Sequence, residues 1–268
     1  MAGIGDVVDS DEEESKDRMF VTALARGLDV LRSFTSGEAL LGNQEISKRT
    51  GLPKPTVCRM THTLTKLGYL RFNSRLEKYQ LGTAVLSLGY SALAGMDIRQ
   101  IARPFMQEMA NATNASVSLG SRDRTSMIYV ESCRGQGPVT LRLDVGSRIP
   151  LATTAMGRAY LATIAEEERS ALMDELKARH AEDWPAISRG IEQALKDYAD
   201  FGFTMSTGEW QPEIHAVGRA IALPDNGGIL AFNCGGAAFL MPRDKLESDY
   251  GPQLLETVRR VEAALSRP

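Results

Sequence analysis

Residues 51–70 read GLPKPTVCRMTHTLTKLGYL, and this stretch carries the strongest structural signal of the chain. From Pro55 to Leu67 its apolar residues recur at helical spacing, which predicts a helix reached through two closely spaced prolines. Proline costs little in the first helical turn, because its missing N–H would have no partner there in any case. We expect Pro55 at the first helical position, where it would hold Lys54 outside the α region. The predicted inward face, with Thr61 beside it, consists of Val57, Met60, Leu64 and Leu67.

The opposite face of this helix carries hydrogen-bond donors and positive charge, on Thr56, Arg59, His62, Thr63 and Lys66. No acidic residue occurs between Leu52 and Leu76. An exposed helix usually mixes charges of both signs, so a face without acids favours an anionic partner. A solvated amphipathic helix is the alternative, and the helix alone does not separate the two.

The segments around this helix predict a winged helix-turn-helix. A helix is expected from Thr22 to Phe34, and a shorter one from Gln44 to Arg49, with Asn43 as its N-cap and Gly51 as its stop. After the central helix, YLRFNSRLEKYQLG reads as two short strands around a turn at 73–75. In such a domain the second helix of the pair enters the major groove of DNA.

Charge is unevenly distributed along the chain, although the net charge is only −3. Residues 1–18 hold seven acidic against two basic side chains and are expected to be a disordered tail. Residues 19–82 hold ten basic against four acidic side chains, the balance that a polyanion-binding domain needs. Chance clustering of surface lysines would give the same count, so the charge supports the helix pattern without replacing it.

The candidate DNA contacts divide by what each side chain can read. Arg59 can donate two hydrogen bonds to a guanine edge, whereas Lys54 and Lys66 are expected at phosphates, which position without specifying. Arg75 and Lys78 lie on the wing, which can reach the minor groove or the backbone, and a solvated wing has nearly equal weight. The full predicted DNA-binding set is Gln44, Lys54, Thr56, Arg59, His62, Thr63, Lys66, Arg75 and Lys78.

The rest of the chain mixes helices and strands without regular βαβ repeats, which predicts an α+β domain with an antiparallel sheet. We expect a linking helix at 83–97 and a second domain at 98–268. Strands are expected at SVSLG, SMIYVES, VTLRLD, the approach to Pro150, AVGRAIALP and GILAFNCGG, the last two paired through a turn at 225–228. Helices are expected at 97–112, with a bend at Pro104, and at 155–164, 166–179, 187–201 and 253–265.

The stretch IPLATTAMGRAYLA, residues 149–162, predicts a strand end followed by a helix that Thr153 or Thr154 can cap. The first N–H groups of a helix have no intrahelical acceptor, and the helix dipole there favours an anion. Such a helix start suits a carboxylate, although an ordinary capped helix has the same pattern. The N–H groups expected to point outward are those of Ala155, Met156 and Gly157.

From about Phe20 onward the chain resembles the IclR family of transcription regulators. The resemblance rests on the set and order of ALARGLDVLRSF, EISKRTGLPKPTVCRMTHTLTKLGYL, YQLG, DIRQIARPFMQEMANATN, GSRIPLATTAMGRAYLA, AVGRAIALP and GILAFNCGG. It implies a GAF-like ligand-sensing domain, and dimers that pair into tetramers on a pseudo-palindromic operator. Serine usually stands where this chain has Pro55, so one hydroxyl that could contact DNA is missing.

The resemblance also implies a pocket for a small organic acid. Where relatives that sense small keto acids tend to carry small or polar groups, this chain has Met156, Trp210 and Ala220, and a bulky apolar lining suits an aromatic or larger acid. Combined with the capped helix start, the predicted effector-binding set is Ile149, Thr154, Ala155, Met156, Gly157, Glu209, Trp210, Ala220, Asn233 and Gly235.

No stretch of the sequence matches a standard catalytic, metal or cofactor motif. The three cysteines are far apart and form no CxxC pair, which favours reduced thiols. Cys234 with His215 as nucleophile and base, or His215 with Glu209 and Glu213 as metal ligands, fits no known spacing. The chain has no run of about twenty apolar residues and no basic-then-apolar N-terminal pattern, so we expect no membrane partner and a cytoplasmic location.

We therefore expect a DNA-binding transcription regulator without a cofactor, which controls a catabolic operon in response to a small organic acid. The effector would favour one arrangement of the DNA-binding domains, with the linking helix as the transmitting element. The alternative is an enzyme of small-acid metabolism whose winged helix is a docking module. The lack of a recognisable nucleophile, acid–base pair or metal motif counts against that alternative.

Overall fold

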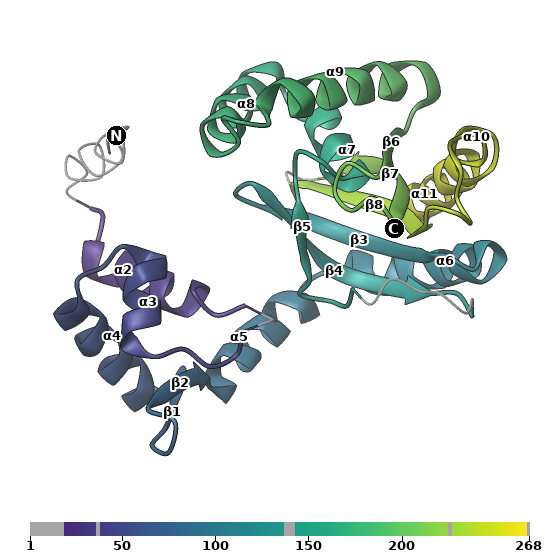
Figure 1. Ribbon diagram of the computed structural model, residues 1–268. Helices are drawn as coiled ribbons and strands as arrows, with labels where there is room; N and C mark the ends of the chain where they lie inside the picture. Colours follow the sequence, from purple (N-terminus) through teal and green to yellow (C-terminus); the bar gives the residue numbers. More distant parts are fainter. Residues whose placement is uncertain (1–18, 36–37, 137–142, 225–226, 267–268) are drawn as a thin grey trace. The chain divides into compact units, whose positions relative to one another are not determined.

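A computed structural model of the chain describes residues 19–35, 38–136, 143–224 and 227–266 (Figure 1). The chain divides into two compact units, Met1–Gly95 and Met96–Pro268. The predicted tail at 1–18 lies outside the described residues, as do four residues of VTLRLD and part of the turn at 225–228. The two described residues of VTLRLD, Leu143 and Asp144, are not in a strand.

The first unit is a winged helix-turn-helix, as the sequence predicts. A small core of Val30, Phe34, Leu41, Ile46, Val57 and Leu70 joins its helices to the first strand of the hairpin. The two strands of the wing pair antiparallel, with Leu70 opposite Leu81. The elements are α2 (Thr22–Arg32), α3 (Asn43–Thr50), α4 (Lys54–Lys66), β1 (Leu70–Asn73), β2 (Lys78–Leu81) and α5 (Thr83–Ala94).

The start of α3 differs from the prediction. Asn43 is the first residue of the helix, and Gly42 is its N-cap. The amide of Gly42 donates to the Glu45 carboxylate at 2.6 Å, so Glu45 satisfies the backbone at this end. The prediction of Gly51 as the stop is confirmed, because Gly51 has a φ of 70° at the C-cap, a left-handed conformation that glycine adopts without strain.

Helix α4 begins one residue earlier than predicted, at Lys54, so Pro53 is its N-cap and Pro55 is its second residue. Pro53 is the extended residue, with φ −58° and ψ 140°, and Lys54 is already helical, so the expectation for Lys54 is wrong. The carbonyl of Pro53 accepts from the amide of Val57 at 3.0 Å, which closes the first turn around Lys54 and outweighs the steric bias from Pro55. At the other end Leu67 is 62 % exposed, because the chain leaves the helix there and turns at Gly68, and it does not belong to the inward face.

The second unit is built on one six-stranded antiparallel sheet with the order β5-β4-β3-β8-β7-β6, which confirms the predicted α+β class. The expected pairing of AVGRAIALP with GILAFNCGG is confirmed, with Val217 opposite Cys234. The edge strand β6 was not predicted. The strands are β3 (Ser116–Asp123), β4 (Ser126–Arg134), β5 (Arg148–Pro150), β6 (Thr204–Thr207), β7 (Ile214–Ala222) and β8 (Ile229–Ala237).

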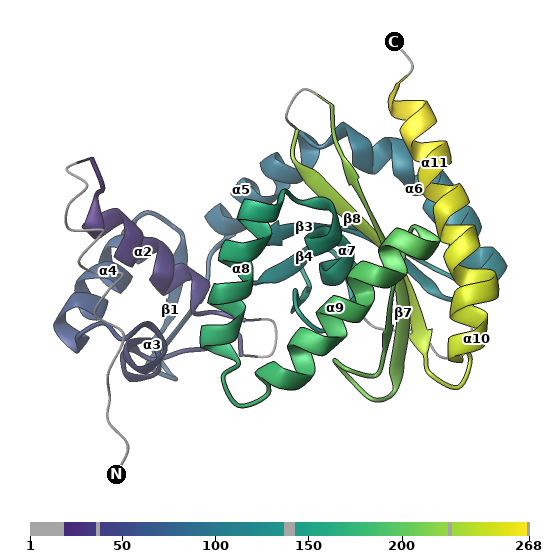
Figure 2. The same cartoon turned by 90° about the horizontal axis from the view of Figure 1, so that it is seen from above.

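Helices cover both faces of this sheet (Figure 2). On one face α7 packs against the strands and α9 lies against α7, while α6 and α11 pack against the other face and against each other. Helix α9 begins earlier than predicted, and the short turns before α11 were missed. The helices are α6 (Asp97–Thr113), α7 (Ala155–Thr163), α8 (Glu166–Arg179), α9 (Trp184–Phe201), α10 (Arg243–Lys245), the π-helix η1 (Leu246–Tyr250) and α11 (Gly251–Leu265).

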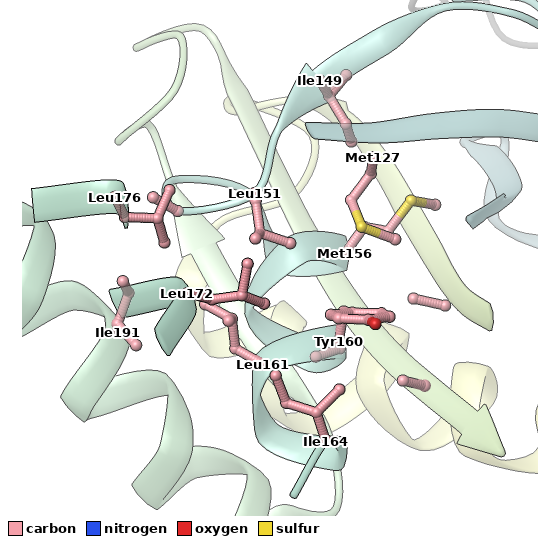
Figure 3. Close-up of a cluster of buried hydrophobic side chains, with 14 of the residues drawn as sticks. Met127, Ile149, Leu151, Met156, Tyr160, Leu161, Ile164, Leu172, Leu176 and Ile191 are labelled. Atoms are coloured by element: carbon pink, nitrogen blue, oxygen red, sulfur yellow. The ribbon is translucent and has the colours of Figure 1, made fainter. Parts of the chain in front are cut away.

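One hydrophobic core of the second unit surrounds α7 (Figure 3). Met156, Tyr160 and Leu161 of α7 are buried in it together with residues of the sheet, of α8 and of α9. A Cβ added to Gly120 would lie 2.4 Å from the Met156 sulfur, so this glycine gives the methionine its space. The core therefore fixes α7, whose first residues face the pocket described below.

Gly157 gives a test of this packing. A Cβ at Gly157 would lie 2.0 Å from the carbonyl oxygen of Leu151, and backbone atoms cannot move aside cheaply. We expect Gly157→Ala to destabilise the protein by about 2 kcal/mol or more, because overpacking outweighs the helix-propensity gain of about 1 kcal/mol. Denaturant unfolding of the full-length protein, followed for both units, measures this change in free energy.

Gly89→Ala in α5 is the matched control, because a Cβ there meets nothing within 4 Å. It should be neutral or stabilising by about 0.5–1 kcal/mol, as expected for a helix interior. If Gly157→Ala stabilised the protein as much as Gly89→Ala, the close contact with Leu151 would not exist.

Candidate DNA-binding helix and effector pocket

The outward face of α4 presents the predicted side chains to solvent. Lys54, Arg59, His62, Thr63 and Lys66 are exposed, and Thr56 is half-buried. Among the described residues, no carboxylate lies within ion-pair distance of Lys54, Arg59 or Lys66. The Thr63 hydroxyl donates to the Arg59 carbonyl at 3.0 Å and keeps its acceptor capacity. This face can therefore donate to an anion without first breaking an ion pair.

Polar contacts between α3 and α4 fix the position of this face. The Thr61 hydroxyl is fully buried, 3.1 Å from the Asn43 side-chain oxygen and 3.0 Å from the carbonyl of Val57. The Asn43 amide nitrogen donates to the Cys58 sulfur at 3.3 Å, and the Ser47 hydroxyl donates to the Leu52 carbonyl at 2.6 Å. These bonds tie the helix pair and its turn together, so the predicted cap residue Asn43 has a role between helices instead.

The wing is tied to α3 by an ion pair. Lys78 donates to the Glu45 carboxylate at 2.8 Å, and the backbone bond from Gly42 together with Lys78 lowers the pKa of Glu45. A phosphate contact by Lys78 would have to replace this partner. Arg75 is exposed at the tip, where its amide donates to the Asn73 side chain at 3.1 Å. Gln44 is exposed on α3.

In the second unit a small pocket lies at the start of α7. Its volume is about 20 Å³, against about 10–15 Å³ for one water molecule on the same measure. It brings together six residues of the predicted set, Ile149, Thr154, Ala155, Trp210, Asn233 and Gly235. It adds four that the sequence did not reveal, Tyr129, Ser206, Ile214 and Ala216. These four come from β4, β6 and β7, and only the order of the strands brings them to one place.

The pocket contains a buried polar group without a partner. Asn233 is 8 % exposed, and its amide nitrogen donates to the Tyr129 hydroxyl at 3.2 Å, while its side-chain oxygen has no hydrogen-bond partner among the described residues. Burial raises the pKa of Tyr129 to about 12, so the phenol stays neutral and keeps its proton. An unpaired buried oxygen costs free energy, so this side chain is set up to bind a donor that enters the pocket.

The start of α7 is capped by Thr154, one of the two predicted caps. Its hydroxyl accepts from the Gly157 amide at 3.2 Å and donates to the Pro150 carbonyl at 2.7 Å. The Gly157 amide is thus occupied and is not an outward donor, contrary to the prediction. At most the amides of Ala155 and Met156 remain for an anion at this helix start.

Four residues of the predicted effector set do not line this pocket. Met156 and Ala220 belong to the core around α7, and Gly157 packs against Leu151. Glu209 is not among the lining residues, and its carboxylate accepts from Arg158 at 2.7 Å. The side chain of its neighbour, Trp210, is the one that lines the pocket.

Arg158 is the buried centre of a network behind the pocket. It also donates to the carbonyls of Ala152 at 3.1 Å and Met205 at 3.2 Å, and a Cβ on Gly190 would lie 2.4 Å from its guanidinium. Burial raises the pKa of Glu209, but the Arg158 charge and the bonds to the carboxylate outweigh this effect and lower it overall. The pair therefore stays ionised and connects α7 to the loop that carries Trp210.

The groups considered for catalysis or metal binding do not assemble. In the described ranges, no three His, Cys, Asp or Glu side chains come together as metal ligands would. Burial raises the pKa of the Cys234 thiol to about 12, and His215 uses its Nδ1 on the Met241 carbonyl at 2.8 Å. Cys234 is therefore a protonated core residue rather than a nucleophile. No helix among the described residues is long and apolar enough to cross a membrane.

A winged helix-turn-helix with an unpaired basic face, followed by a separate domain with a small pocket, defines a DNA-binding regulator with a sensor domain. The chain belongs to the IclR family of transcriptional regulators. Residues 23–74 match the family described as the IclR helix-turn-helix domain, and residues 90–264 match the bacterial transcriptional regulator IclR C-terminal domain. The relatives are transcriptional regulators and not enzymes, in line with the expectation from the sequence.

Several relatives span nearly the whole chain. The transcriptional regulator TsaQ1/TsaQ2 of Comamonas testosteroni is 33 % identical over 91 % of this chain and 88 % of its own. The crystal structure of an IclR-family regulator from Brucella abortus has 46 % identity and a TM-score of 0.88, covering 94 % of this chain and 95 % of its own. An IclR homologue from Microbacterium hydrocarbonoxydans, complexed with 4-hydroxybenzoate, has 18 % identity and a TM-score of 0.67, covering 91 % and 98 %.

Proposed function

We propose that this regulator binds a specific operator through the outward face of α4, and that a small organic acid in the pocket at the start of α7 controls this binding. The DNA-binding part of this proposal rests on the exposed, acid-free face of α4. Arg59, Lys54 and Lys66 on that face have no ion-pair partner among the described residues. The observation that carries the sensor part is the buried Asn233 oxygen without a partner.

On DNA, the N-terminal half of α4 enters the major groove. Arg59 donates to a guanine edge, and Thr56, His62 and Thr63 contact neighbouring bases or phosphates. Lys54, Lys66 and the wing residue Arg75 bind phosphates, which position the helix. Gln44 of α3 contacts the DNA backbone. Lys78 binds a phosphate when it leaves its ion pair with Glu45.

In the pocket, a carboxylate binds at the start of α7, near the amides of Ala155 and Met156. Ile149, Trp210 and Ile214 cover a ring or another apolar body. A hydroxyl on the ligand donates to the unpaired oxygen of Asn233. The Microbacterium relative, which was crystallised with 4-hydroxybenzoate, supports an aromatic acid as the class of ligand.

Self-association follows from apolar surface that the chain leaves exposed. On α5 no residue is buried, and Leu86 and Tyr90 are 72 % and 71 % exposed. On α2, Leu24 and Leu28 are also exposed. A second copy of the chain would cover such surface, so dimers or tetramers on a pseudo-palindromic operator are proposed. The setting is a cytoplasmic regulator of a catabolic operon.

The test uses the full chain and labelled fragments of the DNA next to its gene. Fluorescence anisotropy should show binding whose affinity falls with salt, with a log–log slope near −0.9 for each neutralised phosphate. Adding 4-hydroxybenzoate should change that affinity and raise the melting temperature, because a ligand of the native state stabilises it. If DNA binding were absent or independent of salt, the proposed DNA contacts would be wrong. If 4-hydroxybenzoate did not change the melting temperature, it would not be a ligand of this protein.

A further inference from the structure

A second, larger cavity adjoins the pocket. It is an open groove of about 590 Å³, lined by Thr125, Ser126, Arg148, Ile149, Pro150, Arg179, His180 and Trp210. Ile149 and Trp210 line both the groove and the pocket, so these two side chains form the wall between them. The groove lies at the strand edge formed by β5, where the C-terminal end of α8 contributes Arg179 and His180.

The pocket alone is too small for an organic acid. Its volume of about 20 Å³ admits about one water molecule, whereas a carboxylic acid with a ring or chain is many times larger. A ligand must therefore displace part of the lining, and the shared wall of Ile149 and Trp210 opens onto space that already exists. An elongated ligand that extends past Trp210 would occupy both cavities.

The groove has the chemistry of an anion site. Arg148, Arg179 and His180 face it with the hydroxyls of Thr125 and Ser126, and none of its lining residues is acidic. Arg148 is paired with Asp123 at 2.6 Å and Arg179 with Glu175 at 3.1 Å, both partly exposed. Exposed ion pairs stabilise a protein only weakly, so an incoming carboxylate can replace these partners at little cost.

We propose that the groove is the second anion subsite of the effector site, and that the effector is an organic acid with two anionic ends. One carboxylate binds at the start of α7 in the pocket, and the other binds Arg148 and Arg179 in the groove, with the apolar body against Ile149 and Trp210. This inference rests on the proposed effector function of the pocket. It narrows the ligand from an organic acid to a dicarboxylic acid.

The experiment compares matched mono- and dicarboxylic acids on the full-length protein. The pairs are benzoate with benzene-1,4-dicarboxylate, phenylacetate with 1,4-phenylenediacetate, and hexanoate with hexanedioate. Calorimetry should give an affinity at least tenfold higher for the dicarboxylate of at least one pair. In a Trp184→Phe background, the fluorescence of Trp210 should change when either member of that pair binds, because both contact the shared wall.

Variants then separate the groove from the pocket. Arg148→Gln with Arg179→Gln should lower the affinity for the dicarboxylate at least tenfold, and should change that for the monocarboxylate less than twofold. Arg243→Gln is the control. Arg243 is an exposed arginine that pairs with Glu247, four residues further along the chain, at 3.1 Å. Arg179 pairs with Glu175 at the same distance and the same spacing. It should alter neither affinity, and melting temperatures without ligand check that all variants fold.

The outcomes distinguish the two levels of the proposal. The second subsite is overturned if both members of every pair bind with equal affinity. It is also overturned if the double variant loses the same affinity for both ligands. In either case the pocket remains the effector site. If 4-hydroxybenzoate binds and none of the six acids does, the second subsite alone is overturned. If none of the seven acids binds, the second subsite and the effector pocket are both overturned. A preference for the dicarboxylate that the double variant abolishes supports the inference.

Discussion

Replacing Glu209 by Ala is expected to destabilise the second unit by about 3 kcal/mol. The change leaves the guanidinium of Arg158, whose side chain is 3 % exposed, without its counter-charge. Breaking a buried ion pair from one side costs about 3–5 kcal/mol, and the low end applies because Glu209 is itself 38 % exposed. Arg158 also keeps its bonds to the carbonyls of Ala152 and Met205. Denaturant unfolding measures the loss.

Two further variants make this prediction specific. Glu247→Ala removes an exposed partner of Arg243 and should cost no more than about 1 kcal/mol. The double change Arg158→Met with Glu209→Leu should recover most of the stability, because it removes the buried charge of Arg158 together with its partly exposed partner. A small loss in Glu209→Ala, equal to that in Glu247→Ala, would mean that the pair is not buried in solution.

The same pair predicts a pH dependence. The pKa of Glu209 is lowered in the folded protein, so the unfolded chain takes up its proton first as the pH falls. The stability that Glu209 provides is therefore complete above its ordinary pKa of 4.5 and is lost as the pH falls through the folded value. The difference in stability between the wild type and Glu209→Ala should shrink on acidification below about pH 4.5. A difference that stays constant would contradict the assignment.

Replacing Arg59 by Ala is expected to relax sequence discrimination by about 1–3 kcal/mol at one base pair, which is roughly five- to 160-fold in affinity. The physical reason is the loss of a bidentate contact from an exposed guanidinium that has no ion-pair partner among the described side chains. Anisotropy on an operator and on its single-base variants, at one fixed salt concentration, measures the change.

Lys66→Ala is the matched comparison on the same face. A phosphate contact carries no sequence information, so this change should weaken binding to all fragments alike and reduce the salt slope by about 1. If Arg59→Ala behaved in the same way as Lys66→Ala, Arg59 would be a phosphate contact and the base would be read by another residue.

The DNA-binding unit could be predicted from the sequence because its signals are local. The apolar stripe of α4, the proline turn before it and the hairpin after it all lie within a few residues of one another, and helical or strand periodicity reports them directly. The errors there are also local, such as the first helical residue at Lys54 and the cap at Gly42. The bonds from Asn43 to Thr61 and Cys58 were missed because they join two helices.

The pocket could be predicted only in part. Thr154 and Ala155 are adjacent in the sequence and follow from the capping pattern of one helix. Tyr129, Ser206 and Ala216 were missed because they come from three different strands, and nothing in the sequence gives the order of those strands in the sheet. Glu209 and Trp210 are neighbours in the chain and face different surroundings, one an arginine and the other the pocket.

The class of the protein follows from local features of its sequence: a basic winged helix-turn-helix, followed by an α+β domain with a capped helix start. Propensity and periodicity act over a few residues, and together with the charge distribution they identify this class. Which side chains meet depends on the three-dimensional fold. The packing of α7 on the sheet buries Met156 and Arg158, and Trp210 is left between a small pocket and a basic groove. Burial and contact across distant segments depend on the whole fold, because each is a property of what surrounds a residue and not of the residue itself.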